Sequence, residues 1–366
     1  MKSLLCILSI MVQFIVLLFL NSCASDAPFK FENSTIPEQL NDGWQTASPE
    51  DVDIDQTTLD RVYRNFISED HFQNSKSLLI VKNNRLIFET YCRNTGDRDR
   101  FGHVASVTKS VTSLVFGIVF AEGHIDSIGH RLYDIMPDKF PSDEQKQSIT
   151  LEHLLTMRSG ISFDNDDFSY EILAEKPDDP IKYILKKSTY AMPGETFYYR
   201  DCDPHLISYT IQRLTGKTLA QWAEERLFSP MGIENYYWEA DHTGITTGPF
   251  GLYLIPRDMA KIGQLVLNHG QWQGVQLLDS SWISLSTRKQ VDVEEQTEPY
   301  IYHYGYYWWI IPRWQAISAW GTGGNYIFIR PQQNLIIVMT SMADVDGDLF
   351  KQNLSTFEEL ITPLLE

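Results

Sequence analysis

The chain has 366 residues and a formal net charge of −18 at pH 7, which is long enough for one large domain or two lobes that share a core. This acidic balance argues against a nucleic-acid partner, because no basic cluster is present to neutralise phosphates. It also disfavours unassisted adhesion to anionic lipid.

The first residues, 1–22, have the pattern of an export signal. Lys2 precedes an apolar stretch over residues 4–20, and small residues follow it, which is typical of a signal peptide. The run Leu-Asn-Ser-Cys that ends at Cys23 also resembles the bacterial lipobox, whose cysteine is acylated as the signal is removed. A plain signal anchor with an incidental cysteine is the alternative. We expect lipid attachment at Cys23 and a location in the bacterial cell envelope, in the periplasm or at the outer membrane, with the lipid as the link to the membrane.

The four cysteines do not indicate a disulfide scaffold. One leaves with the signal and Cys23 is the expected anchor, so Cys92 and Cys202 remain. An exported protein could bridge them, but their spacing does not show that they are close, and we do not expect a disulfide. A polar spacer is expected over residues 23–45.

The body begins with strands and continues with helices. Residues 77–91 predict two short strands around the turn Asn83–Asn84. A mainly apolar helix follows Ser106 and ends near Gly123. The next helices are predicted from caps and stop signals: Thr150 to Gly160, Asp203–Pro204 to Gly216, Thr218 with Gln221 onward, and 256–268 with Gly270 beyond.

Aromatic and β-branched runs dominate after residue 300. "YGYYWWII", "QAISAW", "NYIFIRP" and "NLIIVMTS" predict consecutive antiparallel strands, and residues 350–364 predict a final helix. The expected fold is α+β, with an antiparallel sheet built from both terminal segments and flanked by helices, and an inserted, mainly helical lobe. The catalytic domain would span 46–366, with a sheet lobe over about 46–105 and 245–366 and a helical lobe over about 106–244.

Ser106 and Lys109 form a Ser-x-x-Lys motif at the start of an apolar helix. Residues three apart share a helix face, and the helix dipole would favour an alkoxide there. We expect burial among apolar neighbours to lower the pKa of Lys109, so that it can accept a proton. A helix cap followed by a surface lysine is the simpler alternative. A second copy, Ser286 with Lys289, precedes the polar stretch "QVDVEEQ" and predicts a solvated turn.

Further motifs follow in a fixed order: "ASVTKSVTSLVFGIVFAEGHID", "ITLEHLLTMRSGISF", "MPGETFYYRDCDPHLISYTIQRLTGKTL", "LFSPMGI" and "LIPRDMAKIGQLVLNHGQW". With this order, residues 45–350 or so resemble the serine β-lactamase-related hydrolases. That superfamily includes class C β-lactamases, D-alanyl-D-alanine peptidases, esterases and aminohexanoate-oligomer hydrolases, and the last two are the most similar branch.

The resemblance implies site residues. Ser106 would be the nucleophile and Lys109 the general base or proton relay, while the family's Tyr-x-Asn element places a proton-shuttling tyrosine at Tyr199. Asp201 stands where lactamases carry asparagine, so it either orients Lys109 or supports the neighbouring helix cap. Tyr199 could alternatively be one of many core aromatics.

The family's Lys-Thr-Gly strand should fall near "SAWGTGGN", residues 318–325, where no lysine or histidine occurs. This absence weakens the lactamase and peptidase alternatives and favours an uncharged ester or amide as the small-molecule substrate. A backbone N–H near Gly321 or Thr322 could join that of Ser106 as an oxyanion hole. A tight β-turn is the alternative, and it is compatible with that role.

Other chemistries lack their motifs. No Gly-x-Ser-x-Gly elbow, zinc motif, phosphate loop or dinucleotide fingerprint occurs, so we expect neither metal nor cofactor, and we expect His103 and His153 to pack or lie at the surface. The leading hypothesis is a serine hydrolase that works through an acyl-enzyme on a small ester or amide. The alternatives are a class C-like β-lactamase or D-alanyl-D-alanine peptidase and, more distantly, a non-catalytic binding or sensor protein on the same fold.

Overall fold

The structure is a computed structural model that describes residues 35–68, 72, 74–92, 95–163, 165, 168–293, 300–342 and 357–365. The chain divides into two compact units, Met1–Asn33 and Ser34–Glu366, and the described residues all belong to the second. The expected signal and the lipid attachment at Cys23 therefore lie outside the described residues. Within the part that is described, no helix is long and apolar enough to cross a membrane.

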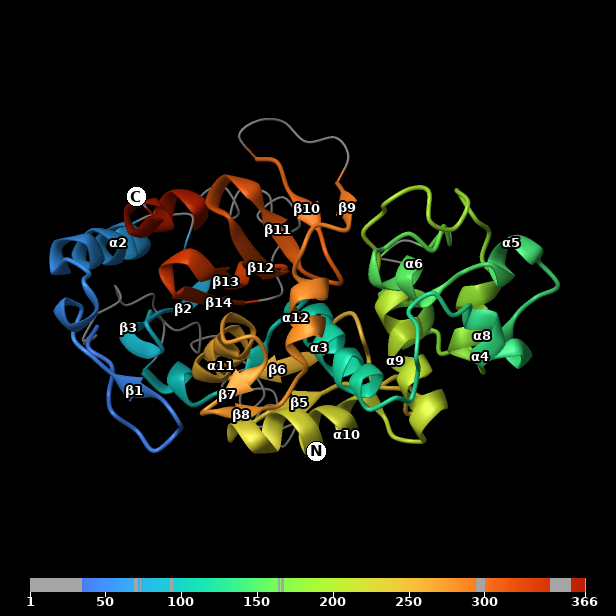
Figure 1. The fold of residues 1–366 in the computed structure, drawn as a ribbon, viewed down its shortest axis with the longest axis horizontal. Helices are drawn as coiled ribbons and strands as arrows, with labels where there is room; N and C mark the ends of the chain where they lie inside the picture. Colours follow the sequence, from blue (N-terminus) through green and yellow to red (C-terminus); the bar gives the residue numbers. More distant parts are fainter. Residues whose placement is uncertain are drawn as a thin grey trace, which may run out of the picture. The chain divides into compact units, whose positions relative to one another are not determined.

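The centre of the fold is a mainly antiparallel sheet (Figure 1). Among the described residues it has nine strands in the order β1-β3-β2-β14-β13-β12-β11-β10-β9, and only β1 and β3 pair in parallel. The strands are β1 Gln45–Thr46, β2 Ser75–Lys82, β3 Arg85–Tyr91, β9 Val291–Asp292, β10 His303–Tyr304, β11 Trp309–Ile311, β12 Ala316–Gly321, β13 Asn325–Arg330 and β14 Leu335–Ser341. The sheet thus joins the two terminal segments, and the predicted fold class is confirmed.

Both faces of the sheet are buried, which explains the unbroken apolar runs in its central strands. In β14, Ile336 and Val338 face the core that includes helix α11 (Pro256–Leu267). The alternate residues Ile337 and Met339 face α2 (Gln56–Ser68) and the helix at 357–365. Since side chains alternate along a strand, each face receives its own layer of helices.

Two small sheets and a set of helices complete the described chain. The minor strands are β4 Gly102–His103, β5 Tyr237–Trp238, β6 Leu252–Leu254, β7 Gln271–Trp272 and β8 Val275–Gln276. The remaining helices are α3 Val107–Ala121, α4 Leu132–Ile135, α5 Glu144–Gln147, α6 Leu151–Leu155, α8 Pro180–Lys186, α9 Cys202–Thr215, α10 Leu219–Ala223 and α12 Ser280–Ser286. Short helical turns link several of them, including a π-helical segment at Phe168–Ala174.

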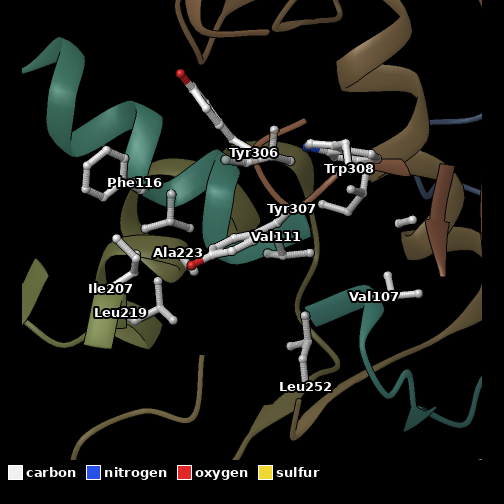
Figure 2. Packing of buried hydrophobic residues seen from close by; sticks show 14 of the residues in the cluster. Val107, Val111, Phe116, Ile207, Leu219, Ala223, Leu252, Tyr306, Tyr307 and Trp308 are labelled. Atoms are coloured by element: carbon white, nitrogen blue, oxygen red, sulfur yellow. The ribbon is translucent and has the colours of Figure 1, made fainter. Parts of the chain in front are cut away.

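Helix α3 lies between the sheet, which it contacts at β12, and helix α9 (Figure 1). It is buried from Val107 to Val119, as expected of a helix that is apolar on all sides. Its side chains pack against α9, α10 and the segment before β11. Phe116 of α3 and Ile207 of α9 belong to this shared core (Figure 2). Helix α3 is thereby packed against β12 and β13 in the interior of the sheet.

Most predicted helix boundaries match the structure, and two differ. Thr150 does cap α6, but the helix ends at Leu155 because Met157 adopts a left-handed backbone with φ 57°, well before Gly160. Helix α9 begins at Cys202 rather than after Asp203. The carboxylate of Asp203 is buried and accepts a hydrogen bond from the Ser159 hydroxyl at 2.6 Å, so it is not available as a cap.

The segment expected as a spacer, 23–45, contacts the body in its described part, residues 35–45. Trp44 is buried, and its indole N–H donates to the Arg257 carbonyl at 3.2 Å. The Arg257 guanidinium also binds Asp42 at 2.8 Å. Residues 35–45 are therefore part of the folded body rather than of a spacer. Cys92 and Cys202 form no disulfide with each other.

Candidate active site

Ser106 lies at the point where the chain turns from the small sheet into α3. Ala105, directly before it, has a left-handed backbone with φ 50°, a strained conformation for a residue with a side chain. Ser106 is the N-cap of α3, but its side chain makes no capping bond. The N–H groups of the next three residues donate to carbonyls three positions back, so the Ser106 N–H lies ahead of this hydrogen-bonded turn.

The Lys109 side chain is directed at Ser106. Its ammonium donates to Ser106 Oγ at 2.9 Å, to Asp201 Oδ1 at 2.6 Å and to the Pro249 carbonyl at 3.2 Å, although the residue is only 1% exposed. Three acceptors match the three N–H bonds of a protonated lysine. This contact set therefore fits a charged Lys109 rather than a neutral amine.

The pKa of Lys109 is raised, contrary to the expectation from sequence. Burial acts to lower the pKa, but the neighbouring Asp201 and Tyr199 outweigh it, both through charge and through hydrogen bonds. The apolar neighbours in the sequence predict that Lys109 is buried, and burial lowers the pKa of a lysine. They do not predict the nearby Asp201 carboxylate, because its position depends on the fold. The Asp201 carboxylate makes no helix-capping bond and instead holds Lys109.

Tyr199 lies against the same ammonium. Lys109 Nζ is 4.7 Å from the centre of the Tyr199 ring, within the range of a cation–π contact. The ring is stacked on Trp309 at 5.7 Å between centroids and meets Tyr304 edge-on at 6.1 Å. The structure thus brings Ser106, Lys109, Tyr199 and Asp201 into one cluster.

The end of β12 passes closely behind the Ser106 turn. A Cβ atom on Gly321 would lie 2.4 Å from the Val104 carbonyl oxygen and 3.1 Å from Ala105 Cβ, so only glycine permits this approach. Strand β11 pairs with Ala316–Ser318 alone, which leaves the following part of β12 without a strand partner on that side.

The loop beyond Gly321 is held by side chains from the sheet. The amide of Asn325 donates to the Thr322 carbonyl at 3.1 Å, and Gly323 and Gly324 both have positive φ. Gly321 and Thr322 therefore lie in a fixed turn beside the residues that precede Ser106. Their assignment to an oxyanion hole remains a prediction.

The second Ser-x-x-Lys pair is not assembled. Ser286 is buried at the end of α12, where its hydroxyl donates to the Ile283 carbonyl at 3.3 Å, and Lys289 instead pairs with Asp292 at 2.6 Å. The prediction of a solvated turn is wrong for Ser286, because the N–H of Tyr306 binds the Ser286 carbonyl and Trp282 anchors the helix in the core.

Arg200 and the two histidines named above, His103 and His153, have structural partners. The Arg200 guanidinium is buried and donates to the carbonyls of Tyr198 and Ile161 and to the hydroxyl of Tyr190. His153 completes the capping box with Thr150. His103 Nε2 accepts from the Gly251 N–H at 3.1 Å.

Sequence reasoning missed two members of this site. The Pro249 carbonyl is a backbone acceptor, whose position no side-chain motif indicates. Trp309 belongs to the aromatic run that predicted a strand, and only the pairing of β11 with β12 brings it to Tyr199.

Comparison with known proteins defines the family of this fold. The family model "Beta-lactamase" matches residues 67–358, which is most of the chain. The chain belongs to the Beta-lactamase family. Its members that resemble this chain are hydrolases, and the serine, lysine and tyrosine cluster described above lies inside the matched region.

Two curated proteins are similar to this chain in sequence, and one solved structure is similar in fold. The 6-aminohexanoate-dimer hydrolase of Paenarthrobacter ureafaciens is 21% identical over 291 residues, which cover 74% of this chain and 73% of that protein. A protein of Salmonella paratyphi A named "Putative D-alanyl-D-alanine carboxypeptidase" is 21% identical over 313 residues, 67% of this chain and 72% of its own. The crystal structure of a family VIII carboxylesterase superposes with a TM-score of 0.67 at 16% identity and covers 84% of this chain and 97% of that one.

Proposed function

We propose that this member of the Beta-lactamase family is a serine hydrolase that cleaves a small, uncharged ester or amide through an acyl-enzyme. The observation that carries the proposal is the 2.9 Å contact between Lys109 Nζ and Ser106 Oγ inside a buried cluster. A surface lysine after a helix cap, the alternative from sequence, would not be 1% exposed with three acceptors. A nucleophile in contact with a proton-transfer group is the arrangement that covalent catalysis requires.

The raised pKa of Lys109 changes which residue transfers the proton of Ser106. A charged ammonium cannot accept the Ser106 proton, so we assign Lys109 to orient Oγ and to stabilise the alkoxide that develops there. We assign Tyr199, whose ring lies against the Lys109 ammonium, to relay the Ser106 proton to the leaving group. Asp201 keeps Lys109 charged and in place.

The reaction then proceeds in two balanced halves. Ser106 Oγ bonds to the substrate carbonyl carbon while its proton passes to Tyr199, and the carbonyl oxygen becomes an oxyanion near the N–H groups of Ser106 and of Gly321 or Thr322. The oxyanion collapses, the leaving group takes the proton from Tyr199, and an acyl-enzyme remains. Water adds to the acyl carbon by the reverse proton route and releases the acid together with the Ser106 hydroxyl.

The substrate class follows from the charges around the nucleophile. Residues 318–325 carry no cation, and Arg200 is committed to carbonyls and a phenol elsewhere. Loss of one charge-assisted contact costs about 1.5–3 kcal/mol, or roughly ten- to hundredfold in kcat/KM. A carboxylate-bearing lactam or D-alanyl-D-alanine peptide is therefore the second candidate, favoured only by a relative's name.

A substrate panel tests this ranking. Short-chain p-nitrophenyl esters, aminohexanoate dimer, nitrocefin and a D-alanyl-D-alanine peptide are compared by kcat/KM on the purified protein. We expect the esters to exceed nitrocefin and the peptide by at least tenfold. Faster turnover of nitrocefin would reject the ranking, and no turnover of any substrate would favour the non-catalytic alternative.

A further inference from the structure

A cavity of about 210 Å³ lies at the ends of β2 and β14. Its polar lining comes from Lys76, Asp97, Arg100, Asn325, Thr340 and Ser341. Neither Ser106 nor Lys109 contributes to it, so the hydrolase mechanism does not account for this cavity. Its volume is sufficient for a small molecule or the charged end of a larger one.

Two cations meet at this cavity. Lys76 Nζ lies 3.4 Å from the position that a Cβ atom on Gly102 would occupy, which places the ammonium over the cavity wall. Among the described residues, neither Lys76 nor Arg100 forms an ion pair. Asp97 offsets one of the two charges, and the wall is left with an excess positive charge in a chain whose net charge is −18.

The start of helix α11 also lies at the cavity wall. Pro256, the first residue of α11, lines the cavity, but it has no N–H to donate, and the first turn of the helix carries Asp258, which pairs with Lys261 at 2.8 Å. No side chain caps this end. The two cations, Lys76 and Arg100, therefore carry the preference for an anionic ligand with several acceptor oxygens.

The cavity wall is connected to the loop beside the nucleophile. Asn325 is buried; its amide donates to the Thr322 carbonyl at 3.1 Å, and its Oδ1 accepts from the Ser341 N–H at 3.0 Å. The Ser341 hydroxyl donates to the Gly324 carbonyl at 3.1 Å. A ligand in the cavity would therefore lie against the residues that fix the Thr322–Gly324 loop.

We propose that this cavity is a second ligand site, which binds a carboxylate or phosphate group through Lys76 and Arg100. The site is separate from the Ser106 cluster, because Val104 and Gly321 are in contact between the two. Its ligand is an anionic small molecule that is not the hydrolysed substrate.

The test uses isothermal titration calorimetry of the full protein with inorganic phosphate and, separately, with acetate, at constant ionic strength. We expect saturable binding with one site per chain for at least one anion. Lys76→Gln with Arg100→Gln should weaken it at least tenfold. The matched control, Arg61→Gln with Lys186→Gln, removes the same charge from exposed positions on α2 and α8 and should bind as the unmodified protein does.

The outcomes separate the sources of binding. Binding of phosphate alone or of acetate alone identifies the group that the cavity prefers. If the double variant does not fold, Arg100→Gln, at an exposed position, should by itself weaken binding several-fold. No saturable binding of either anion, or equal binding by the cavity and control variants, would overturn the proposal. Because the assay does not measure hydrolysis, its result is independent of the proposed function.

Discussion

At the scale of single residues, the chemistry of the site depends on one carboxylate. Asp201 lies 2.6 Å from Lys109 Nζ and helps to raise a pKa that burial alone would lower. The lysine is therefore in its charged form over the whole neutral range, and its pKa lies above the ordinary value of 10.5. If Asp201 keeps Lys109 charged, replacing Asp201 with a neutral residue should change the activity.

Asp201→Asn should move the alkaline limit of activity to lower pH. The amide keeps an acceptor for Lys109 but removes the negative charge, so burial acts with less opposition and the lysine loses its proton earlier as pH rises. The measurement is kcat/KM for an alkyl ester across neutral and alkaline pH, with the released acid recorded by pH-stat titration. Asp138→Asn, which breaks an exposed ion pair with Arg213, should leave the profile unchanged. An unaltered alkaline limit in Asp201→Asn would show that this carboxylate does not set the charge of Lys109.

At the scale of secondary-structure elements, the site depends on the approach of β12 to the turn before α3. Gly321 makes the approach possible, since any side chain there would meet the Val104 carbonyl. The Tyr199 ring stacks on Trp309 of β11, which is itself stacked on Trp320 of β12 at 4.5 Å. One pair of strands therefore supports two sides of the candidate site.

Gly321→Ala should reduce kcat/KM for esters by about a hundredfold, the scale observed when an oxyanion-hole donor is lost. The added methyl group would lie 2.4 Å from a backbone oxygen, which can be relieved only by moving β12 away from Ser106. Gly129→Ala is the control, because its Cβ would meet only the Ser127 hydroxyl at 3.3 Å. Both variants are compared by thermal unfolding and by ester turnover. Full activity in Gly321→Ala would place the oxyanion elsewhere.

The sequence predicts elements better than it predicts contacts between them. The hairpin at Asn83–Asn84 and the capping box of Thr218 with Gln221 are local patterns, and both are present. The Lys109–Asp201 pair joins residues 92 positions apart, and its effect on the pKa follows from the tertiary fold. Asp203 shows the same limit. Aspartate is a residue type that commonly caps a helix, but the Asp203 carboxylate instead accepts a hydrogen bond from the Ser159 hydroxyl.

At the scale of the whole molecule, the body folds around a sheet that joins both ends of the described chain. The N-terminal residues 35–45 are fixed to this body through Trp44 and Arg257. A lipid tether at Cys23, which the sequence predicts, would therefore leave only about a dozen residues between the membrane surface and the folded body. Extended residues span at most about 3.3–3.6 Å each, so such a tether would hold the enzyme close to the membrane.

Cys23→Ser should release the protein from the membrane fraction into the soluble extract. The reason is that a chain with a net charge of −18 is not expected to adhere to anionic lipid without assistance. The measurement is immunoblotting of membrane and soluble fractions from the expressing bacterium, with Cys92→Ser as the matched control. If the Cys23→Ser protein stays in the membrane fraction, the attachment does not depend on acylation of that cysteine.

The central claim is that Ser106, and not Ser286, is the nucleophile. Its most direct test is the intact mass of the protein after reaction with a fluorophosphonate, which adds to an activated serine and remains bound. The unmodified protein and Ser286→Ala should each gain one adduct, located at Ser106 by peptide mapping, and Ser106→Ala should gain none. A full adduct on Ser106→Ala, or its loss in Ser286→Ala, would contradict the account.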